Sequence, residues 1–335
     1  MNLPQRISLL IRLGEYLQAN GPAWQEVKLK AEQQNAWFTE DFIDHAVNHM
    51  ARQWLTRATL EQWAASEQVP DQPMTPKTVA VVMAGNIPLV GFHDWLAIFI
   101  SGHRALVKLS SKDAVLLPHL FEQLLVWEPA CLPYVQIAER LNGADAYIAT
   151  GSNNSARYFS YYFGKYPHLI RKNRTAVALL SGQETMAELL ALADDVHLYF
   201  GLGCRNVSKL YVPAGYDFVP LLDAFKKYAP LSEHHKYKNN YDYQLALLIL
   251  NKKYYMTNGT LLLTEEESLF APLGQLHYEY YDHPSQTLST TLAHADLQCL
   301  VGFGGLPVGS SQHPSIDDYA DGVNTLAFLN KKMLN

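Results

Sequence analysis

The residue best suited to do chemistry is Cys204, in the stretch Gly-Leu-Gly-Cys-Arg-Asn at residues 201–206. The thiolate is the reactive form of cysteine, and a nearby cation or backbone amides lower the pKa of a thiol. Two glycines leave the backbone here open, and Arg205 supplies a cation. A cysteine that attacks a carbonyl carbon needs such surroundings. Sequence alone weighs this interpretation evenly against a buried cysteine that packs as a small hydrophobe.

The other two cysteines, Cys131 and Cys299, lie in apolar stretches and fit the packing role. Three widely spaced cysteines match neither a disulfide framework nor a zinc motif. We therefore expect no metal site and a reducing, cytoplasmic environment.

Three further candidate sites lie at or just after the ends of predicted strands. The Asn86 amide sits in a tight turn, where it could donate to a developing oxyanion, although a turn asparagine more often bonds its own backbone. Lys108 ends a strand at the edge where open α/β sheets bind ligands, or it is simply solvated. Thr150, Gly151 and Ser152 lead from a strand into a helix, whose first amides suit a pyrophosphate. They complete no known phosphate-binding motif.

The elements that must position these residues form two predicted α/β domains. Residues 1–70 read as a helical segment, which a proline-rich stretch separates from the first α/β domain at residues 71–183. There, short β-branched runs alternate with helical patterns. The expected strands are 78–85, 104–110, 144–152 and 175–182, and the expected helices are 89–102, 113–127 and 154–166. This alternation is typical of a doubly wound parallel sheet.

The second predicted α/β domain covers residues 184–310 and carries the cysteine. Its expected helices are 184–200, 218–228 and 243–253, and its expected strands are 208–213, 259–265 and 276–282. A C-terminal tail at residues 311–335 should pack on the first domain or on a partner subunit.

Composition limits the function classes. The chain has 335 residues, of which 48% are hydrophobic and 17% are charged, which fits a globular protein with a large core. A net charge of -6 with scattered Lys and Arg argues against general nucleic-acid binding. No apolar run reaches roughly 18 residues, so we expect no membrane span. The first residues lack a signal-peptide core.

Taken in order, Ala-Gly-Asn-Ile-Pro-Leu-Val, Leu-Val-Lys-Leu-Ser-Ser, Ala-Thr-Gly-Ser-Asn-Asn-Ser-Ala and Gly-Leu-Gly-Cys-Arg-Asn resemble segments of the aldehyde dehydrogenase superfamily. Within it they look most like the acyl-CoA reductase family of the LuxC type. The resemblance covers roughly residues 75–330. It implies an aldehyde dehydrogenase-like fold whose first α/β domain binds a dinucleotide and whose second is catalytic.

The resemblance also implies roles for single residues. Asn86 would be the oxyanion donor, and Lys108 would hold the adenosine ribose. Ser111 stands where NAD-preferring members carry an acidic residue. A serine leaves room for a 2′-phosphate, which Lys112 could help neutralise. This favours NADPH, with NADH possible.

Three more roles follow from the same resemblance. Residues 150–152 would lie near the pyrophosphate or the nicotinamide, and Cys204 would be the attacking thiolate. Residues 265–274 resemble a Glu-x-Phe-Gly-Pro segment after a shift of one residue. That match implies that Glu267 holds the nicotinamide ribose and that Phe270 touches the ring.

One departure from the family pattern bears on the reaction. Hydrolytic members carry a glutamate in a Glu-Leu-Gly-Gly stretch, which activates water. We match this stretch to residues 178–184, where Leu179, Leu180 and Ser181 replace the acid and Glu184 lies further on. General-base catalysis typically contributes about 10²–10⁴-fold, so its loss favours a thiol such as coenzyme A as acyl acceptor.

The sequence therefore predicts reduction of an acyl-CoA or acyl-carrier thioester to an aldehyde, through a cysteine-bound acyl group. An ordinary aldehyde dehydrogenase with Glu184 as a displaced base stays open, as does a catalytically silent binding or assembly protein on the same fold. The resemblance makes a homo-oligomer plausible. Candidate proton donors are His93, His197, His234 and His235.

Overall fold

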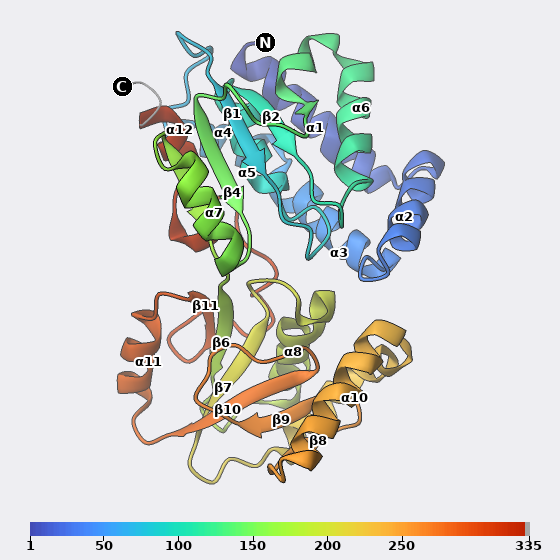
Figure 1. Cartoon of the computed structure of the whole chain (residues 1–335), viewed down its shortest axis with the longest axis vertical. Helices are drawn as coiled ribbons and strands as arrows, with labels where there is room; N and C mark the ends of the chain where they lie inside the picture. Colours follow the sequence, from blue (N-terminus) through green and yellow to red (C-terminus); the bar gives the residue numbers. More distant parts are fainter. Residues whose placement is uncertain (332–335) are drawn as a thin grey trace. The chain divides into compact units, whose positions relative to one another are not determined.

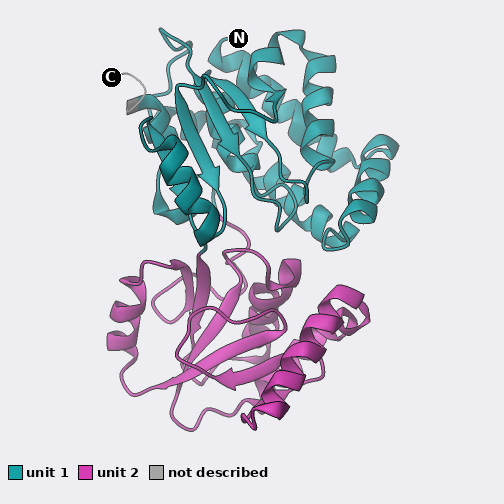
Figure 2. Cartoon of the chain, viewed as in Figure 1, with its two compact units in different colours: residues 1–173, 315–335 teal, residues 174–314 magenta. Residues whose placement is uncertain are grey.

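The computed structural model describes residues 1–331 and divides into two compact units (Figures 1 and 2). Unit 1 consists of residues 1–173 and the C-terminal segment from Ser315, and unit 2 is residues 174–314. Each unit is built on its own sheet.

The N-terminal part of unit 1 is helical. Its elements are α1 (Leu3–Ala19), α2 (Pro22–Gln34), α3 (Glu40–His49), the π-helical turn η1 (Met50–Trp54) and α4 (Arg57–Ser66). Helix α1 begins with a capping box in which the Asn2 side chain accepts from the Gln5 N–H. Its leucines at positions 9, 10, 13 and 17 are buried, which is the spacing of one helix face.

The sheet of unit 1 is parallel, with the strand order β3-β2-β1-β4-β5. Its strands are β1 (Thr78–Val82), β2 (Arg104–Lys108), β3 (Gln136–Ile137), β4 (Ala146–Thr150) and β5 (His168–Arg171). Its connections contain α5 (Phe92–Ser101), α6 (Leu116–Trp127), the 3-10 helix η2 (Pro129–Tyr134) and α7 (Asn153–Phe163). The chain moves outward in one direction from β1 to β2 and in the other from β4 to β5. The point between β1 and β4 is therefore a topological switch point.

The sheet of unit 2 has the order β11-β6-β7-β10-β9-β8, and only the β8–β9 pair is antiparallel. Its strands are β6 (Thr175–Leu179), β7 (Val207–Pro213), β8 (Met256–Thr257), β9 (Leu262–Glu265), β10 (Gln275–Tyr281) and β11 (Leu297–Gly302). Its helices are α8 (Met186–His197), η3 (Leu198–Gly201), α9 (Val219–Phe225), η4 (Lys226–Glu233), α10 (His235–Leu250) and α11 (Pro284–Leu292). Two α/β units with parallel sheets and a helical N-terminal part confirm the predicted fold class.

The domain limits differ from those expected. We placed residues 175–182 in the first domain, but β6 pairs with β7 and β11, so it belongs to the second sheet. The chain therefore passes from unit 1 to unit 2 after residue 173 instead of after 183. The sequence pattern missed β5, whose first three residues are half-buried, and we counted β6 as the last strand of the first domain instead. The N-terminal helices share unit 1 with the first sheet and form no separate unit.

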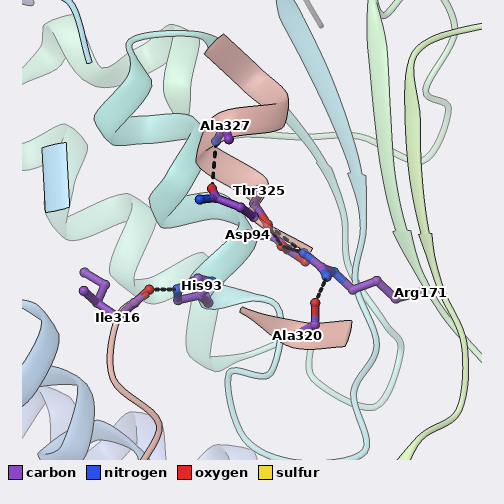
Figure 3. Close-up of polar contacts among 8 residues, drawn as sticks. His93, Asp94, Arg171, Ile316, Ala320, Thr325 and Ala327 are labelled. Carbon is purple, nitrogen blue, oxygen red and sulfur yellow. Dashed lines mark hydrogen bonds and ion pairs between the residues drawn. The ribbon is translucent and has the colours of Figure 1, made fainter. Parts of the chain in front are cut away.

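A buried ion pair ties the C-terminal segment to unit 1 (Figure 3). Arg171, at the end of β5, donates to Asp94 Oδ1 at 2.8 Å and to Thr325 Oγ1 at 2.7 Å. It also donates to the Ala320 carbonyl. The segment contains the short turn η5 (Ala320–Gly322) and α12 (Thr325–Lys331), which packs against α5.

Candidate active site

Cys204 lies in the turn between α8 and β7. We call residues 201–206 the cysteine turn; it follows η3, and β7 begins at Val207. Cys204 is half-buried, whereas its neighbours Arg205 and Asn206 are buried. The turn is thus packed into unit 2 by the residues that follow the cysteine, while the cysteine itself keeps access to the surface.

The Asn206 side chain fastens the cysteine turn to the end of α8. Its Nδ2 donates to the carbonyls of Asp195 at 3.2 Å, Val196 at 3.3 Å and Leu198 at 2.8 Å. Its Oδ1 accepts from the Gly203 N–H at 2.8 Å. The last carbonyls of a helix have no partner within the helix. A single buried amide therefore closes the helix end and holds the residue before Cys204.

The backbone just before the turn is strained. Tyr199, Phe200 and Gly201 have φ values of 53°, 57° and 76°, in the left-handed region. Only glycine adopts this region freely, so two bulky residues there cost stability and persist only where packing holds them. Both rings are buried, and Phe200 contacts the His234 ring with the centroids 4.4 Å apart. Packing and Asn206 together keep the cysteine turn in one conformation.

The cysteine turn lies at the amino edge of the second sheet. Strands β6 and β7 are parallel, and Ala176 pairs with Val207 at the start of both strands. The segment that enters β6 is fixed at this edge, because Arg174 Nη1 donates to the Leu297 carbonyl at 2.8 Å.

Glu184 lies beyond the other edge of this sheet, which corrects its reading as a displaced base for Cys204. It follows the end of β6, a strand of five residues that each advance about 3.3 Å. Its carboxylate accepts from the Ser181 N–H at 2.5 Å, the Ser181 hydroxyl at 2.8 Å and the Gly182 N–H at 3.1 Å. Glu184 therefore closes its own turn, away from the cysteine.

The segment after β9, which carries Glu267 and Phe270, is held near the start of β7. The Ser208 hydroxyl, four residues after the cysteine, donates to the Leu269 carbonyl at 2.5 Å. Buried Lys209 donates through Nζ to the Glu267 carbonyl at 2.7 Å and to a carboxylate oxygen of Glu279. The Glu267 and Phe270 side chains are left exposed.

A buried histidine also braces this segment. His277, in β10, donates from Nδ1 to the Ser268 carbonyl at 2.9 Å. Burial lowers the pKa of His277, so the neutral ring is favoured. Strands β7 and β10 thus fix the backbone beneath the predicted cofactor contacts.

In unit 1, the predicted cofactor residues gather at the carboxyl edge of the sheet. Val82, the last residue of β1, pairs with Lys108 on one side and with Ala149 on the other. Parallel strands end at the same edge, so the loop after β1 lies beside Lys108 and beside the turn after β4. Asn86 is in that loop and is half-buried.

Lys108 and its neighbours leave polar surface at this edge. Lys108 Nζ donates to the Glu139 carbonyl at 3.0 Å, and Ser111 and Lys112 are exposed. Exposed serine and lysine side chains fit a phosphorylated ribose better than an acidic residue would.

The turn after β4 leads directly into the capped start of α7. The Ser152 hydroxyl caps α7 by accepting from the Ser155 N–H at 3.2 Å. A Cβ on Gly151 would lie 2.8 Å from Ser155 Cβ and 3.0 Å from Phe159 Cε2, so only glycine fits without a shift. The first turn of α7 contains no acidic residue. Its backbone amides would therefore suit an anion, and the cofactor role of residues 150–152 stays a prediction.

The predicted residues thus fall into two groups. Unit 1 holds Asn86, Lys108, Ser111 and residues 150–152 at one sheet edge, and unit 2 holds Cys204, Glu267 and Phe270 near the amino edge of the other sheet. The sequence analysis passed over Asn206, although it belongs to the same short motif as the cysteine. The signal that could have revealed it is an asparagine next to a glycine-containing turn.

The first two of the four candidate proton donors pack against aromatic rings. His93 contacts the Ile316 carbonyl through Nε2 at 2.7 Å (Figure 3), and its ring packs on Trp54 and Trp63. His197 is buried and stacks on Tyr228 with the ring centroids 4.7 Å apart. Burial lowers the pKa of His197 to about 4, so it is neutral at pH 7.

The remaining two candidates lie at the start of α10. His234 is its N-cap and accepts from the Tyr237 N–H at 3.3 Å, and His235 is exposed. His234 also contacts Phe200, which precedes the cysteine turn.

The other cysteines differ from Cys204. Cys131 is fully buried, and burial raises the pKa of its thiol to about 12. Cys299 is half-buried in β11 and packs against the core of unit 2. Within residues 1–331, no His, Cys, Asp and Glu side chains cluster as a metal site would require. In the same part of the chain, no helix has both the length and the apolar character that crossing a bilayer demands.

No protein-family model and no curated protein sequence matches this chain. Solved structures do. An NAD+ complex of indole-3-acetaldehyde dehydrogenase is 14% identical, covers 93% of this chain and 74% of its own, and has a TM-score of 0.63. The aldehyde dehydrogenase KauB from Pseudomonas aeruginosa gives 13% identity, 90% and 72% coverage and a TM-score of 0.63.

A third solved structure, the NAD-dependent aldehyde dehydrogenase from Sinorhizobium meliloti, is 12% identical, covers 90% of this chain and 70% of its own, and has a TM-score of 0.66. These matches extend over both units. At such low identity they speak for the architecture alone. The chain therefore has an aldehyde dehydrogenase-like fold.

Proposed function

We propose that this protein is an NAD(P)H-dependent reductase that converts an acyl-CoA or acyl-carrier thioester to an aldehyde through an acyl group bound to Cys204. The fold supports an oxidoreductase that uses a nicotinamide cofactor, because its structural neighbours include aldehyde dehydrogenases bound to NAD+. The accessible cysteine in a rigid turn supports covalent catalysis.

In the proposed reaction, Cys204 Sγ bonds to the thioester carbonyl carbon and the carbon–sulfur bond to coenzyme A breaks, releasing the CoA thiolate. The Asn86 amide and the Cys204 N–H are the proposed donors to the oxyanion that forms in between. A bound nicotinamide, NADPH in preference to NADH, supplies the hydride that reduces the acyl group. Breaking the bond to Cys204 then frees the aldehyde and restores the thiolate.

The chain's own residues fit such a cofactor. Lys108 and Ser111 would meet the adenosine ribose, with Lys112 beside a 2′-phosphate, and the turn at residues 150–152 would meet the pyrophosphate. Glu267 and Phe270 would contact the nicotinamide ribose and ring, because both side chains are exposed on a braced segment.

The placement of Glu184 is the observation that carries the choice of reaction. A hydrolytic enzyme needs a base that activates water against the acyl-cysteine. Glu184 is bound in its own turn beyond the opposite sheet edge. An acyl-Cys204 would therefore be long-lived toward water and would react with hydride or with a thiol.

Oxidation of an aldehyde without coenzyme A is the second candidate. The names of the structural neighbours favour it. It would need a base other than Glu184, and it would give a carboxylate.

One experiment separates these candidates. The protein is incubated with NADPH and acyl-CoAs of increasing chain length, and NADPH loss, CoA release and aldehyde are measured together. We expect all three in a 1:1:1 ratio, abolished in C204A and retained in the matched variant C299A. Turnover of aldehydes with NAD+ and without coenzyme A would favour the second candidate. Turnover of neither, with equally slow alkylation of all three cysteines, would favour a silent binding protein.

A further inference from the structure

Asp113 lies in the connection from β2 to α6 and contacts the loop that carries Asn86. Its sequence position suits a helix N-cap, but α6 begins at Leu116 with Val115 as its N-cap. Instead, Asp113 Oδ2 accepts from the Leu89 N–H at 2.9 Å. The residue is only 8% exposed, so this is a buried carboxyl group.

This hydrogen bond joins two loops at the carboxyl edge of the first sheet. One is residues 83–91, with Asn86, and the other is residues 109–115, with Ser111. The loops also touch at Gly85, where a Cβ would lie 2.6 Å from Ser110 Oγ. One carboxylate therefore connects the proposed oxyanion donor to the proposed ribose site.

The Leu89 backbone needs this support. Its φ of 55° lies in the left-handed region, which a leucine adopts only where other contacts hold it. A hydrogen bond to an ionised carboxylate is about twice as strong as one between neutral groups. Ionised Asp113 can thus offset the strain that a neutral partner would offset only in part.

Asp113 also lines a small cavity. Among the described residues, Asp113 Oδ1 has no hydrogen-bond partner. The cavity has a volume of about 10 Å³, close to what one water molecule needs. Apart from Asp113, its lining is apolar: Met83, Ala84, Leu89, Gly91, Phe92, Leu109 and Leu117.

Within the part of the chain that the structure describes, no charged side chain compensates the carboxylate. The lining residues from the β1 loop, α5 and α6 are not titratable, and the adjacent Lys112 is exposed. Burial raises the pKa of Asp113 to about 6, and the Leu89 and Leu116 amides only partly oppose this rise. The group therefore changes charge just below neutral pH.

We propose that Asp113 is a positioning residue: its carboxyl group holds the Asn86 loop against the ribose loop, so that Asn86 stays in place for the reaction. The catalytic half of this inference rests on the proposed function. The structural half does not.

Hydrogen exchange tests the structural half without turnover. The exchange rate of the Leu89 amide is measured at pH 8 in the wild type, D113A and D113N. We expect protection in D113A to be roughly tenfold lower than in the wild type, because the Leu89 N–H loses its acceptor. D113N keeps an acceptor and should retain most of the protection.

Asp145 provides the matched control. It is exposed, and its Oδ2 accepts from the Thr78 N–H at 2.7 Å at the start of β1, away from the Asn86 loop. D145A should exchange at Leu89 as the wild type does. Equal Leu89 protection in D113A and the wild type, or an equal loss of protection in D145A, would overturn the proposal.

Steady-state kinetics test the catalytic half. In D113A, kcat for acyl-CoA reduction should be about tenfold lower than in the wild type, with a smaller change in the KM for NADPH. D113N, which keeps an acceptor for the Leu89 N–H, should recover most of kcat. Normal kcat in D113A would refute this half and leave the reductase intact. If no variant reduces an acyl-CoA, the proposed function fails, and exchange still decides the structural role.

Discussion

At the scale of single residues, the buried carboxyl group of Asp113 should make the protein less stable as the pH rises toward neutral. Because its pKa is raised to about 6 in the folded state, from 3.8, the group's contribution to stability is full below pH 4 and is lost as the pH rises through 6. Asparagine does not titrate. When the pH is raised from 3.5 to 8, D113N should therefore gain about 3 kcal/mol of stability relative to the wild type, seen as a larger free energy of unfolding.

Urea unfolding at the two pH values measures this difference. D145N, in which an exposed carboxylate is changed, controls for general charge effects. A D113N difference that is the same at both pH values would show that Asp113 titrates normally.

Gly151 carries the second prediction at this scale. An added methyl group would meet Ser155 and Phe159 at 3.0 Å or less, so G151A should shift the turn that faces the cofactor. We expect about tenfold weaker NADPH binding, measured by fluorescence titration, with little change in the melting temperature. G143A is a fitting control, because no atom lies within 4 Å of a Cβ there, although its φ of 80° brings some strain. Equal NADPH affinity in G151A and wild type would argue against this turn as the pyrophosphate site.

At the scale of elements, the cysteine turn depends on Asn206. N206A removes four hydrogen bonds to backbone groups, some of them buried, and we expect it to lower the free energy of unfolding by about 2–4 kcal/mol. N206D should be at least as damaging, because a carboxylate cannot donate to three carbonyls. Displacement of the turn should also lower kcat/KM about 100-fold.

The matched variant is N240A. Asn240 likewise donates from Nδ2 to a helix carbonyl, that of Lys236 at 2.8 Å, but on the exposed surface. N240A should therefore lower the free energy of unfolding by less than about 0.5 kcal/mol. N206D with full stability and activity would mean that the turn is held by packing alone.

The sequence predicted elements where one pattern dominates. Helix α5 ends at Ser101, where Gly102 takes a φ of 81°, as its glycine stop indicates. Strands β1, β2 and β4 are short apolar runs, and all were expected. Strands β3 and β8 have two residues each and leave no periodicity to read. Neither the sheet that β6 joins nor the carbonyls that Asn206 reaches can be read from local pattern, because both depend on distant residues.

At the scale of the whole molecule, Arg171 links the two chain segments that make up unit 1, residues 1–173 and the C-terminal segment. Removing one partner of a buried ion pair leaves the other charge uncompensated, so R171M should lower the free energy of unfolding by about 3–5 kcal/mol. Limited proteolysis should then cut near Ser315 faster than in the wild type. The exposed pair of Arg57 and Glu61 is the control, and R57M should cost less than about 1 kcal/mol. An R171M protein as stable and protease-resistant as R57M would contradict the account of the tail.

The placement of the site residues also shows what the sequence could and could not predict at this scale. Motif order along the chain led to Cys204, Asn86 and Lys108, because each follows or precedes a strand. The same reading offered Glu184 as a displaced base, because it lies a few residues after the position of the family's acid. The parallel register of β6 and β7 separates them, since one lies beyond the carboxyl edge and the other at the amino edge.

The most direct test of the central claim is to trap the acyl group on Cys204. The protein is mixed with an acyl-CoA in the absence of NADPH, and released CoA and the mass of each cysteine peptide are measured. The account predicts a burst of one CoA per chain, an acyl adduct on the Cys204 peptide that is stable in water, and its discharge as aldehyde when NADPH is added. Consumption of NADPH with no adduct at Cys204, or with an adduct on Cys131 or Cys299 instead, would contradict it.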